Sequence, residues 1–357
     1  MGKILINGNE AIAEGAIRAG CRFFAGYPIT PQNEIPAYMA KRMPEIGGVF
    51  IQPESELAAI SMVMGASASG FRAITTSSSP GVSLKQEGIS YIAGAQLPAV
   101  IVNIMRAGPG LGNIWPAQSD YFQATKGGGH GDYRNIVLAP STVQEAFDLT
   151  LLAFELADIY RNPVMILGDG MLGQMMEPIT ISDIKRKPDS KDMVPLDKPW
   201  ALTGCRNRKL NLVASFRMRE GEMEKRNLEL QAHYKEIVRK EQRYEAFNEK
   251  EAEIIIVAYG TMGRIAKGAI KRLEADNKKV GLIRPIGLWP FCKDVFTKLF
   301  KDNATLKKIL VVEMSYGQML EDVELTVLGR YPVEFFGRSG GGVPTEEEIV
   351  KKVLELY

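Results

Sequence analysis

The feature that most constrains the fold is a repeated alternation of short apolar runs with stretches of helical spacing. Apolar runs too short for helices alternate with segments such as 57–68 and 143–160. Strands that alternate with helices favour a mostly parallel sheet covered by helices on both faces. The predicted strands are 1–7, 23–25, 49–51, 73–76, 99–102, 136–138 and 164–167, and later 254–257, 280–283, 309–312 and 333–336.

The alternation is interrupted between residues 181 and 250. Residues 185–189 form a predicted polar turn, and 218–248 are dense in Glu, Lys and Arg with scattered apolar residues. This pattern predicts one or two long exposed helices, either a solvated connector or a docking arm for a partner. The sequence therefore predicts an α/β domain at 1–180, a charged connector at 181–250 and a smaller α/β domain at 251–357.

Two predicted helices begin with the spacing of a capping box, in which Ser or Thr is followed three residues later by Gln or Glu. The first pair is Ser141 and Gln144, and the second is Thr345 and Glu348. Both mark where a helix is expected to start.

Composition excludes several functions. The formal net charge is +2, which argues against a dedicated nucleic-acid binder. No apolar run could span a bilayer and the N-terminal segment lacks a signal-peptide pattern, so we expect a cytoplasmic protein without a membrane segment. The three cysteines and two histidines are scattered, so we expect neither an iron–sulfur cluster nor another metal site on this chain.

Residues 26–31, Gly-Tyr-Pro-Ile-Thr-Pro, follow the predicted strand 23–25. Ligands of open α/β sheets bind at such carboxyl ends of strands. Two prolines stiffen the turn and would fix Thr30 in place. Thr30 is therefore either the N-cap of the next helix or a ligand contact.

Glu54 and Glu56 follow the predicted strand 49–51 and precede a helix of small apolar residues. A glutamate at a helix start can be no more than a favourable charge there. Alternatively, a partly buried glutamate can serve as a proton donor.

Two glycine-rich segments follow. Arg106 opens the loop 106–112, which matches no phosphate-binding fingerprint. Its side chain could pair bidentately with a carboxylate, or could be a surface arginine beside a flexible loop. His130 lies among four glycines of residues 127–131, a loop shaped by backbone needs, and is a candidate for an active site.

Together these segments are more specific than each one alone. Residues 27–31, Glu56 with its Ala-rich helix, residues 75–81 and Arg106, in this order, resemble the α subunit of the 2-oxoacid:ferredoxin oxidoreductases. The resemblance covers essentially the whole chain and includes residues 284–291, Arg-Pro-Ile-Gly-Leu-Trp-Pro-Phe. Residues 126–132 and 169–178 are most similar to the branched-chain (2-oxoisovalerate) type, with the 2-oxoglutarate type as its near neighbour.

The resemblance implies a pyrimidine-type domain that covers the aminopyrimidine half of thiamine diphosphate, and a second domain of the transketolase C-terminal type. A β subunit would cover the diphosphate and Mg²⁺, and iron–sulfur clusters would lie on other chains. Thiamine enzymes hold Mg²⁺ with Gly-Asp-Gly followed by a downstream Asn. Here Gly168-Asp169-Gly170 has no Asn in residues 185–198, so we interpret it as a strand-end turn.

The resemblance also implies roles for single residues. Glu56 matches the glutamate that hydrogen-bonds N1′ of the pyrimidine, and Thr30 and Arg106 match residues that contact the substrate carboxylate. Glu54 competes with Glu56, which we prefer because it lies nine residues before Gly65. The remaining candidates are Tyr27, Pro28 and Ile29 for the cofactor and His130 for the substrate.

The implied reaction is oxidative decarboxylation of a 2-oxoacid to acyl-CoA and CO₂, with ferredoxin as electron acceptor and with β, γ and ferredoxin-like partner subunits. Its substrate is expected to be 2-oxoisovalerate and related branched-chain acids, with 2-oxoglutarate as the alternative. A β subunit of a lipoyl-linked 2-oxoacid dehydrogenase shares the two-domain layout, but residues 27–31 and 284–291 argue against it. A subunit that serves only regulation or assembly also remains open.

Overall fold

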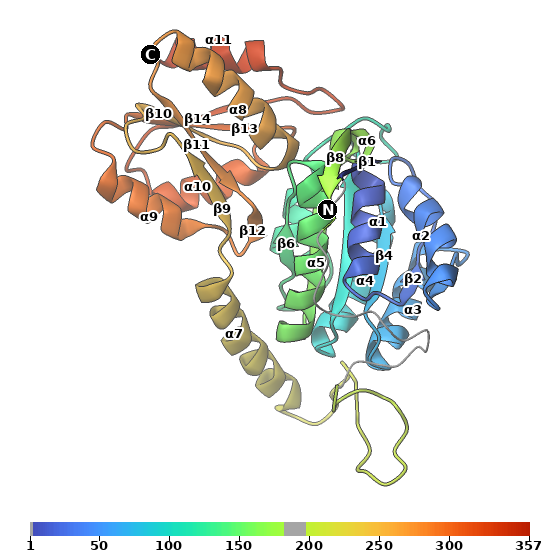
Figure 1. Ribbon diagram of the computed structural model, residues 1–357. Helices are drawn as coiled ribbons and strands as arrows, with labels where there is room; N and C mark the ends of the chain where they lie inside the picture. The colour runs from blue at the N-terminus through green and yellow to red at the C-terminus, as the bar shows by residue number, and fades with distance from the viewer. Residues whose placement is uncertain (1–2, 182–197) are drawn as a thin grey trace.

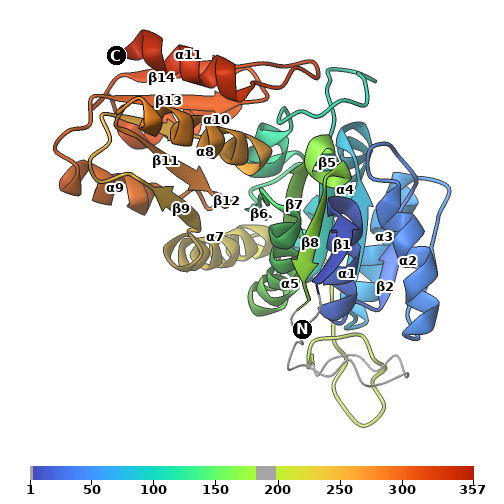
Figure 2. The same ribbon diagram turned by 45° about the horizontal axis from the view of Figure 1, so that its top comes forward.

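The computed structural model describes residues 3–181 and 198–357. Two α/β units lie beside each other, and the long helix α7 (Glu222–Lys240) extends from below the second unit toward the first (Figure 1). The described chain begins in the first unit and ends on the outer edge of the second (Figures 1 and 2).

The first unit is built on a seven-stranded sheet in the order β12-β6-β7-β5-β4-β2-β3. All neighbouring strands are parallel except β12, which is antiparallel to β6. The strands are β2 (Phe23–Ala25), β3 (Val49–Ile51), β4 (Ala73–Ser77), β5 (Ala99–Met105), β6 (Ile136–Leu138), β7 (Pro163–Asp169) and β12 (Gly287–Trp289).

Two helical layers cover this sheet because its strands are apolar on both faces. In β5, Val100, Val102 and Ile104 belong to the core with α1, α2 and α5, whereas Ile101 and Met105 belong to the core with α3 and α4. This is the two-residue alternation of a strand. The helices are α1 (Gly8–Arg18), α2 (Glu34–Glu45), α3 (Glu56–Ala68), α4 (Ser79–Gly94) and α5 (Val143–Tyr160).

Three smaller elements complete this unit. The strands β1 (Lys3–Asn7) and β8 (Met176–Thr180) form an antiparallel pair. The short helix α6 (Gly170–Gln174) follows β7, and a π-helical turn, η1, spans Gln123–Gly127.

The second unit contains a five-stranded sheet in the order β14-β13-β10-β11-β9. Only β9 is antiparallel to its neighbour. The strands are β9 (Tyr244–Phe247), β10 (Ile254–Val257), β11 (Val280–Pro285), β13 (Lys308–Glu313) and β14 (Val333–Gly337), and the helices are α8 (Gly260–Ala275), α9 (Lys293–Asp302), α10 (Gln318–Val327) and α11 (Glu346–Leu356).

The predicted charged helix is confirmed over the residues of α7, but its end differs from the prediction. Leu230, Tyr234 and Ile237 form a buried stripe against the first unit, so α7 is solvated on one side only. Residues 244–247 form β9 instead of more helix, because they pair with β11. The polar turn predicted at 185–189 lies outside the described residues.

Strands and side chains join the two units. β12 comes from the second unit but adds to the sheet of the first. At a separate contact, Gln118 exchanges backbone and side-chain hydrogen bonds with Met314, and its amide donates to the Tyr259 carbonyl at 2.9 Å. Thr261 Oγ1 donates to Asp169 Oδ2 at 2.6 Å. The units are therefore held in one arrangement.

One predicted capping box is confirmed and the other is wrong. Thr345 and Glu348 exchange both bonds at the start of α11. In α5 the N-cap is Thr142 and not Ser141, and the Thr142 hydroxyl accepts from the Glu145 backbone N–H at 3.1 Å. The sequence holds overlapping Ser-x-x-Gln and Thr-x-x-Glu spacings. Gln144 instead bonds with Asp148 and Thr180.

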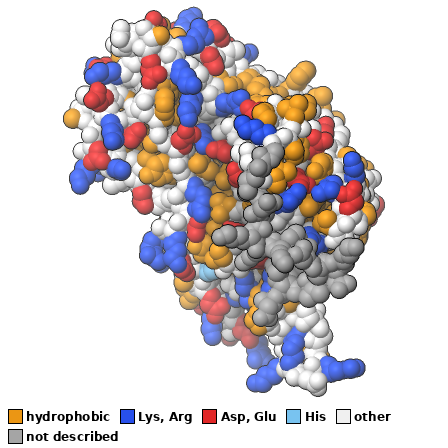
Figure 3. All heavy atoms as spheres, in the orientation of Figure 1, with side chains coloured by type: hydrophobic (Ala, Val, Ile, Leu, Met, Phe, Trp, Pro, Cys, Tyr) orange, Lys and Arg blue, Asp and Glu red, His pale blue; other side chains and the backbone are white. Residues whose placement is uncertain are grey.

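Within residues 3–181 and 198–357, we find no helix that combines the length and the apolar character needed to cross a bilayer. Acidic and basic side chains are interspersed over the second unit on the face drawn in Figure 3.

Candidate functional site

Most of the predicted site residues gather at one edge of the first sheet. β2, β3, β4 and β5 are parallel, so their carboxyl ends lie at the same edge. Thr30, Glu56 and Arg106 follow β2, β3 and β5, and Ser77 ends β4. The fold thus groups residues that are 76 positions apart in the chain, since Arg106 Nη1 donates to the Thr30 carbonyl.

Glu56 occupies the first position of α3, and the structure separates it from Glu54. Ser55 is the N-cap and its hydroxyl accepts from the Ala58 N–H at 3.2 Å. This cap leaves Glu54 exposed outside the helix and turns Glu56 inward, where the residue is only 6% exposed. Across the described part of the chain, no hydrogen-bond donor reaches the Glu56 carboxylate. A buried carboxylate without a donor is costly unless a ligand or a nearby charge compensates it.

Gly81 in the first turn of α4 lies directly against this carboxylate. A Cβ atom at Gly81 would lie 2.6 Å from Glu56 Oε1 and 2.1 Å from Ser77 Oγ. Any side chain there would displace both groups. The hydroxyls of Ser77 and Ser78 are buried and have no partner among the described residues. The end of β4 therefore presents polar atoms that remain available to a ligand.

Lys85 is a residue of this site that sequence reasoning missed. It is fully buried, and its Nζ donates to Thr75 Oγ1 at 2.7 Å and to the Thr76 carbonyl at 3.0 Å. Burial lowers the pKa of Lys85 to about 7, against the opposing attraction of Glu56. The signal was present: Lys85 lies three residues after Val82 and four before Ile89, on the buried stripe of α4.

Arg106 is held by backbone carbonyls. Its Nη1 donates to the Thr30 carbonyl at 3.0 Å and its Nη2 to the Leu111 carbonyl at 3.1 Å. The Nε atom is buried and lacks a partner among the described residues. Arg106 is thus a fixed cation whose Nε–H has no acceptor among the described residues, and it is not the freely moving surface arginine that the sequence left open.

Thr30 is not a helix N-cap, the structural alternative that the sequence left open. The next helix begins at Glu34, its N-cap is Asn33, and Thr30 Oγ1 accepts from Asn33 Nδ2 at 3.2 Å. Tyr27 and Pro28 are exposed, and Ile29 is half-buried. The turn thus keeps Thr30 beside Arg106 and leaves Tyr27 and Pro28 accessible.

A cavity of about 650 Å³ lies beside Arg106, between the two units. Asp120 at its wall accepts from Ser79 Oγ at 2.5 Å and from Asn103 Nδ2 at 2.9 Å, and burial raises the pKa of the Asp120 carboxyl. These bonds tie the start of α4 to the end of β5. The second unit contributes Tyr316, Gln318 and Ser339 to the lining.

His130 is not brought to this edge. It is exposed, its ring meets Tyr91 edge-on at 5.9 Å, and its carbonyl accepts from Ser90 Oγ. Ser90 lies nine residues beyond Gly81 along α4, which corresponds to about 13 Å of helix. A substrate role for His130 stays a prediction that no contact among the described residues supports.

Asp169 has a structural role that agrees with its interpretation as a strand-end turn. Its Oδ1 accepts from the backbone N–H groups of Met171 and Leu172, and its Oδ2 accepts from Thr261. Burial raises the pKa of this carboxyl, and the hydrogen bonds partly offset the increase. Within the described ranges, no three His, Cys, Asp or Glu side chains form a group that could hold a metal ion.

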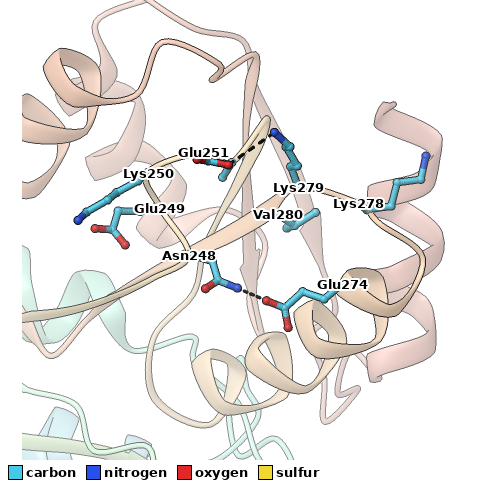
Figure 4. Close-up of a pocket in the computed structure, with 9 residues that line it drawn as sticks. Asn248, Glu249, Lys250, Glu251, Glu274, Lys278, Lys279 and Val280 are labelled. Carbon is cyan, nitrogen blue, oxygen red and sulfur yellow. Dashed lines mark hydrogen bonds and ion pairs between the residues drawn. The ribbon is translucent and has the colours of Figure 1, made fainter.

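A second cavity, of about 530 Å³, lies at the amino ends of β10 and β11 (Figure 4). Two polar contacts cross its lining: Asn248 donates to Glu274, and Lys279 lies 3.6 Å from Glu251. This cavity lacks the buried unsatisfied groups found near Glu56, and we assign no function to it.

Comparison with known proteins defines the class to which this fold and site belong. The family described as "Pyruvate flavodoxin/ferredoxin oxidoreductase, thiamine diP-bdg" matches residues 14–243, and "Pyruvate:ferredoxin oxidoreductase core domain II" matches residues 252–349. The chain therefore belongs to the thiamine-diphosphate-binding 2-oxoacid:ferredoxin oxidoreductase family, as the sequence motifs predicted.

Individual relatives refine this assignment. The ketoisovalerate oxidoreductase subunit VorB of Methanothermobacter marburgensis is 49% identical over 99% of this chain and 97% of its own length. A 2-oxoglutarate:ferredoxin oxidoreductase from Magnetococcus marinus, solved with 2-oxoglutarate, coenzyme A and succinyl-CoA bound, is 29% identical with a TM-score of 0.84. That match covers 99% of this chain, which spans 65% of the solved chain.

The predicted fold class is confirmed. A split-gene transketolase structure matches 98% of this chain and 97% of its own, with a TM-score of 0.60. At 14% identity this likeness concerns the fold alone. It agrees with a pyrimidine-type parallel sheet followed by a transketolase-like second unit.

The residues at the sheet edge fit the aminopyrimidine half of thiamine diphosphate. An aminopyrimidine ring offers nitrogen acceptors and an amino donor. Glu56 and the unpartnered hydroxyls of Ser77 and Ser78 are buried groups that need such partners. Gly81 lets the backbone of α4 pack directly against Glu56 and Ser77, so no side chain of α4 covers these groups at that position. Ring and site therefore complement each other in hydrogen-bonding capacity.

Proposed function

We propose that this chain is the pyrimidine-binding subunit of an oxidoreductase that converts 2-oxoisovalerate and related branched-chain 2-oxoacids to acyl-CoA and CO₂, with ferredoxin as electron acceptor. The observation that carries the proposal is the buried Glu56 carboxylate, without a hydrogen-bond donor in the described chain, at the end of a parallel sheet. The 49% identity to a ketoisovalerate oxidoreductase subunit supports the branched-chain substrate.

Thiamine diphosphate, when bound, supplies the carbon nucleophile and the electron sink of the reaction. Glu56 would donate a hydrogen bond to ring nitrogen N1′ and hold the proton that passes between its carboxyl group and that ring. Ser77 and Ser78 would satisfy other polar atoms of the ring. Burial under α4 excludes water from Glu56, which strengthens this hydrogen bond.

Arg106 and Thr30 would hold the carboxylate of the substrate. The guanidinium is buried, so its charge is poorly screened, and its Nε–H is unused among the described groups. The two carbonyl bonds fix the guanidinium plane before the substrate arrives. Thr30 adds a hydroxyl in the adjacent turn. Tyr27, Pro28 and Ile29 would line the cofactor side of this turn.

The proposal includes partner subunits. A β subunit would cover the diphosphate and its Mg²⁺, and γ and ferredoxin-like subunits would carry the assembly and the iron–sulfur clusters. Coenzyme A would accept the acyl group, and the complex would work in the cytoplasm. Within this chain, residues 1–180 would form the pyrimidine-binding domain, 181–250 the connector and 251–357 the second domain, although β9 and β12 cross these limits in the sheets.

Three alternatives remain as outcomes of the test. A relative named for 2-oxoglutarate, from Archaeoglobus fulgidus, is 39% identical, against 49% for the ketoisovalerate subunit, which favours the branched-chain acid. A lipoyl-linked dehydrogenase subunit would pass its acyl group to lipoamide. A regulatory subunit would not need the buried groups at Glu56 and Arg106.

The test is to purify the chain with the subunits that co-assemble with it, and to measure methyl-viologen reduction with a panel of 2-oxoacids, coenzyme A and thiamine diphosphate. Fastest reduction on 2-oxoisovalerate is expected. Fastest reduction on 2-oxoglutarate would move the substrate but keep the chemistry. Acyl transfer to lipoamide without viologen reduction would favour the dehydrogenase. A complex that turns over equally well without this chain would contradict a catalytic role.

A further inference from the structure

The buried cation beside Glu56 is not used by the mechanism proposed above. Lys85 is fully buried, yet lysine is almost never found there without a paired charge. Its two hydrogen bonds go to neutral oxygens, the hydroxyl of Thr75 and the carbonyl of Thr76. An ammonium group has three donors, so these acceptors leave one N–H unused. The charge itself therefore needs a partner.

The packing of α3 against α4 puts Lys85 over Glu56. Gly81 of α4 meets Glu56, and Gly88 of α4 meets Ile60, where a Cβ would lie 2.5 Å from the isoleucine Cγ2. Lys85 is four residues after Gly81 and three before Gly88, so it lies on the same stripe of α4. Glu56 and Ile60 are likewise one turn apart on α3. The ammonium group is therefore enclosed between α4 and the end of β4, on the side of α4 that faces Glu56, and it interacts with the Glu56 charge without forming a direct ion pair.

Few other charges reach this enclosure. Glu56 is the one charged group, among the residues that the structure describes, that acts on the pKa of Lys85. Arg106 and Asp120 lie beyond the start of α4 and are engaged with Thr30, Leu111, Ser79 and Asn103. From β4 come the neutral Thr75 and Thr76. On the far side, Tyr133 bonds with the Gln86 side chain.

We propose that Lys85 is a positioning residue for Glu56: its buried ammonium group stabilises the ionised form of the Glu56 carboxyl and so biases the shared proton toward the ring nitrogen of bound thiamine diphosphate. The inference rests on the proposed function of Glu56. An opposite charge at close range in a dry site acts strongly because little water screens it. Lys85 touches neither the reacting atoms nor the substrate in this account.

The expected signature is a shift in the pH dependence of cofactor binding. Removing the positive charge lets Glu56 keep its proton to higher pH. The affinity for thiamine diphosphate should then fall at a higher pH in Lys85→Met than in the unmodified protein, by about one to three pH units. The diphosphate group of the cofactor titrates in the same way with every variant. Its contribution therefore cancels when the binding constant of each variant at a given pH is divided by that of Glu56→Gln at the same pH.

The experiment is calorimetric titration of thiamine diphosphate, at constant Mg²⁺, into the cofactor-free complex between pH 4.5 and 7, the range in which Lys85 carries its charge in the folded protein. Thr75→Val is the matched control, since it removes a hydrogen-bond acceptor of Lys85 but keeps the charge. An upward shift in Lys85→Met with an unmoved Thr75→Val curve supports the inference. Coincident curves for Lys85→Met and the unmodified protein would overturn it, as would equal shifts in both variants. Should Lys85→Met fail to assemble, Lys85→Gln makes the same comparison.

The Glu56→Gln curve distinguishes the two levels of the proposal. If Glu56→Gln binds with the same pH dependence as the unmodified protein, the role of Glu56 fails, and the role of Lys85 fails with it. A different outcome is that Glu56→Gln removes an inflection from the plot of cofactor affinity against pH. If Lys85→Met leaves that inflection at the same pH, only the inference about Lys85 is overturned.

Discussion

Two buried carboxylates lie near the carboxyl ends of strands, Glu56 after β3 in the first unit and Glu313 at the end of β13 in the second, and the fold treats them differently. Glu313 at the end of β13 accepts from Ser315 Oγ and from the backbone N–H groups of Met319 and Leu320. Glu56 receives no hydrogen bond within the described chain and faces a glycine and a buried lysine. A buried acid with all its partners in place maintains the structure, whereas one without them is available for a ligand.

The strongest test of this contrast is Glu56→Gln. The amide cannot hold the transferable proton, so we expect turnover of the assembled complex to fall about 10²–10⁴-fold. Gln fills the same volume and Glu56 has no hydrogen bond within the described chain to lose, so any loss of thermal stability should reflect only the missing charge partner of Lys85. Glu54→Gln, two residues earlier in the chain, is the control and should retain near-normal turnover. Equal losses in both variants would show that the charge of the helix start, and not the buried carboxyl, matters.

The next test concerns Arg106→Ala, at the same edge of the sheet. Loss of a charge-assisted pair costs about 1.5–3 kcal/mol, which corresponds to roughly 10–150-fold in kcat/KM. The loss should appear mainly in KM for the 2-oxoacid, with the affinity for thiamine diphosphate preserved. Arg272→Ala, which removes an exposed pair with Glu347, is the matched control and should leave KM unchanged. Weaker cofactor binding with a normal KM would assign Arg106 a different role.

The buried carboxylates that do have hydrogen-bond partners predict a change in stability when a partner is removed. Thr261→Val removes the bond that joins the second unit to Asp169 and leaves a buried carboxylate oxygen without its partner. The free energy of unfolding should fall by about 1–3 kcal/mol, measured by denaturant titration. The control is Thr150→Val: Thr150 bonds only to a carbonyl within its own helix, so the loss should be smaller. A Thr261→Val protein as stable as Thr150→Val would mean that the junction does not depend on this bond.

The last effect is gradual and concerns the pH dependence of stability. The pKa of Lys85 is about 7 in the folded protein and 10.5 in a solvated lysine. Between these values the unfolded chain binds more protons, so stability should rise with pH, by at most about 1.4 kcal/mol per pH unit. Lys85→Met should lack this part of the slope in denaturant titrations at pH 7, 8.5 and 10. Parallel slopes in the two proteins would mean that Lys85 is not buried as a titrating group.

Much of the fold could be predicted because the local pattern of apolar and turn residues agrees with the strands and helices that form. The strand predicted at 23–25 and the helix predicted at 143–160 have the observed bounds, since apolar runs and turn residues determine them locally. β9 was missed because a charged four-residue strand forms only where β11 offers it a partner. β12 was missed for the same reason, since it pairs with β6 of the other unit.

The sequence by itself determined the family, most of the alternation of strands and helices, and the residues Thr30, Glu56 and Arg106 as candidates, because these depend on motifs and on local periodicity. The tertiary structure decided which of them meet. Packing between distant segments joined Arg106 to Thr30, placed His130 against Ser90, about 13 Å along α4 from Gly81, and enclosed Lys85 on the side of α4 that faces Glu56. The proximity of Lys85 to Glu56 depends on how α3, α4 and β4 pack together, and no local sequence pattern encodes that packing.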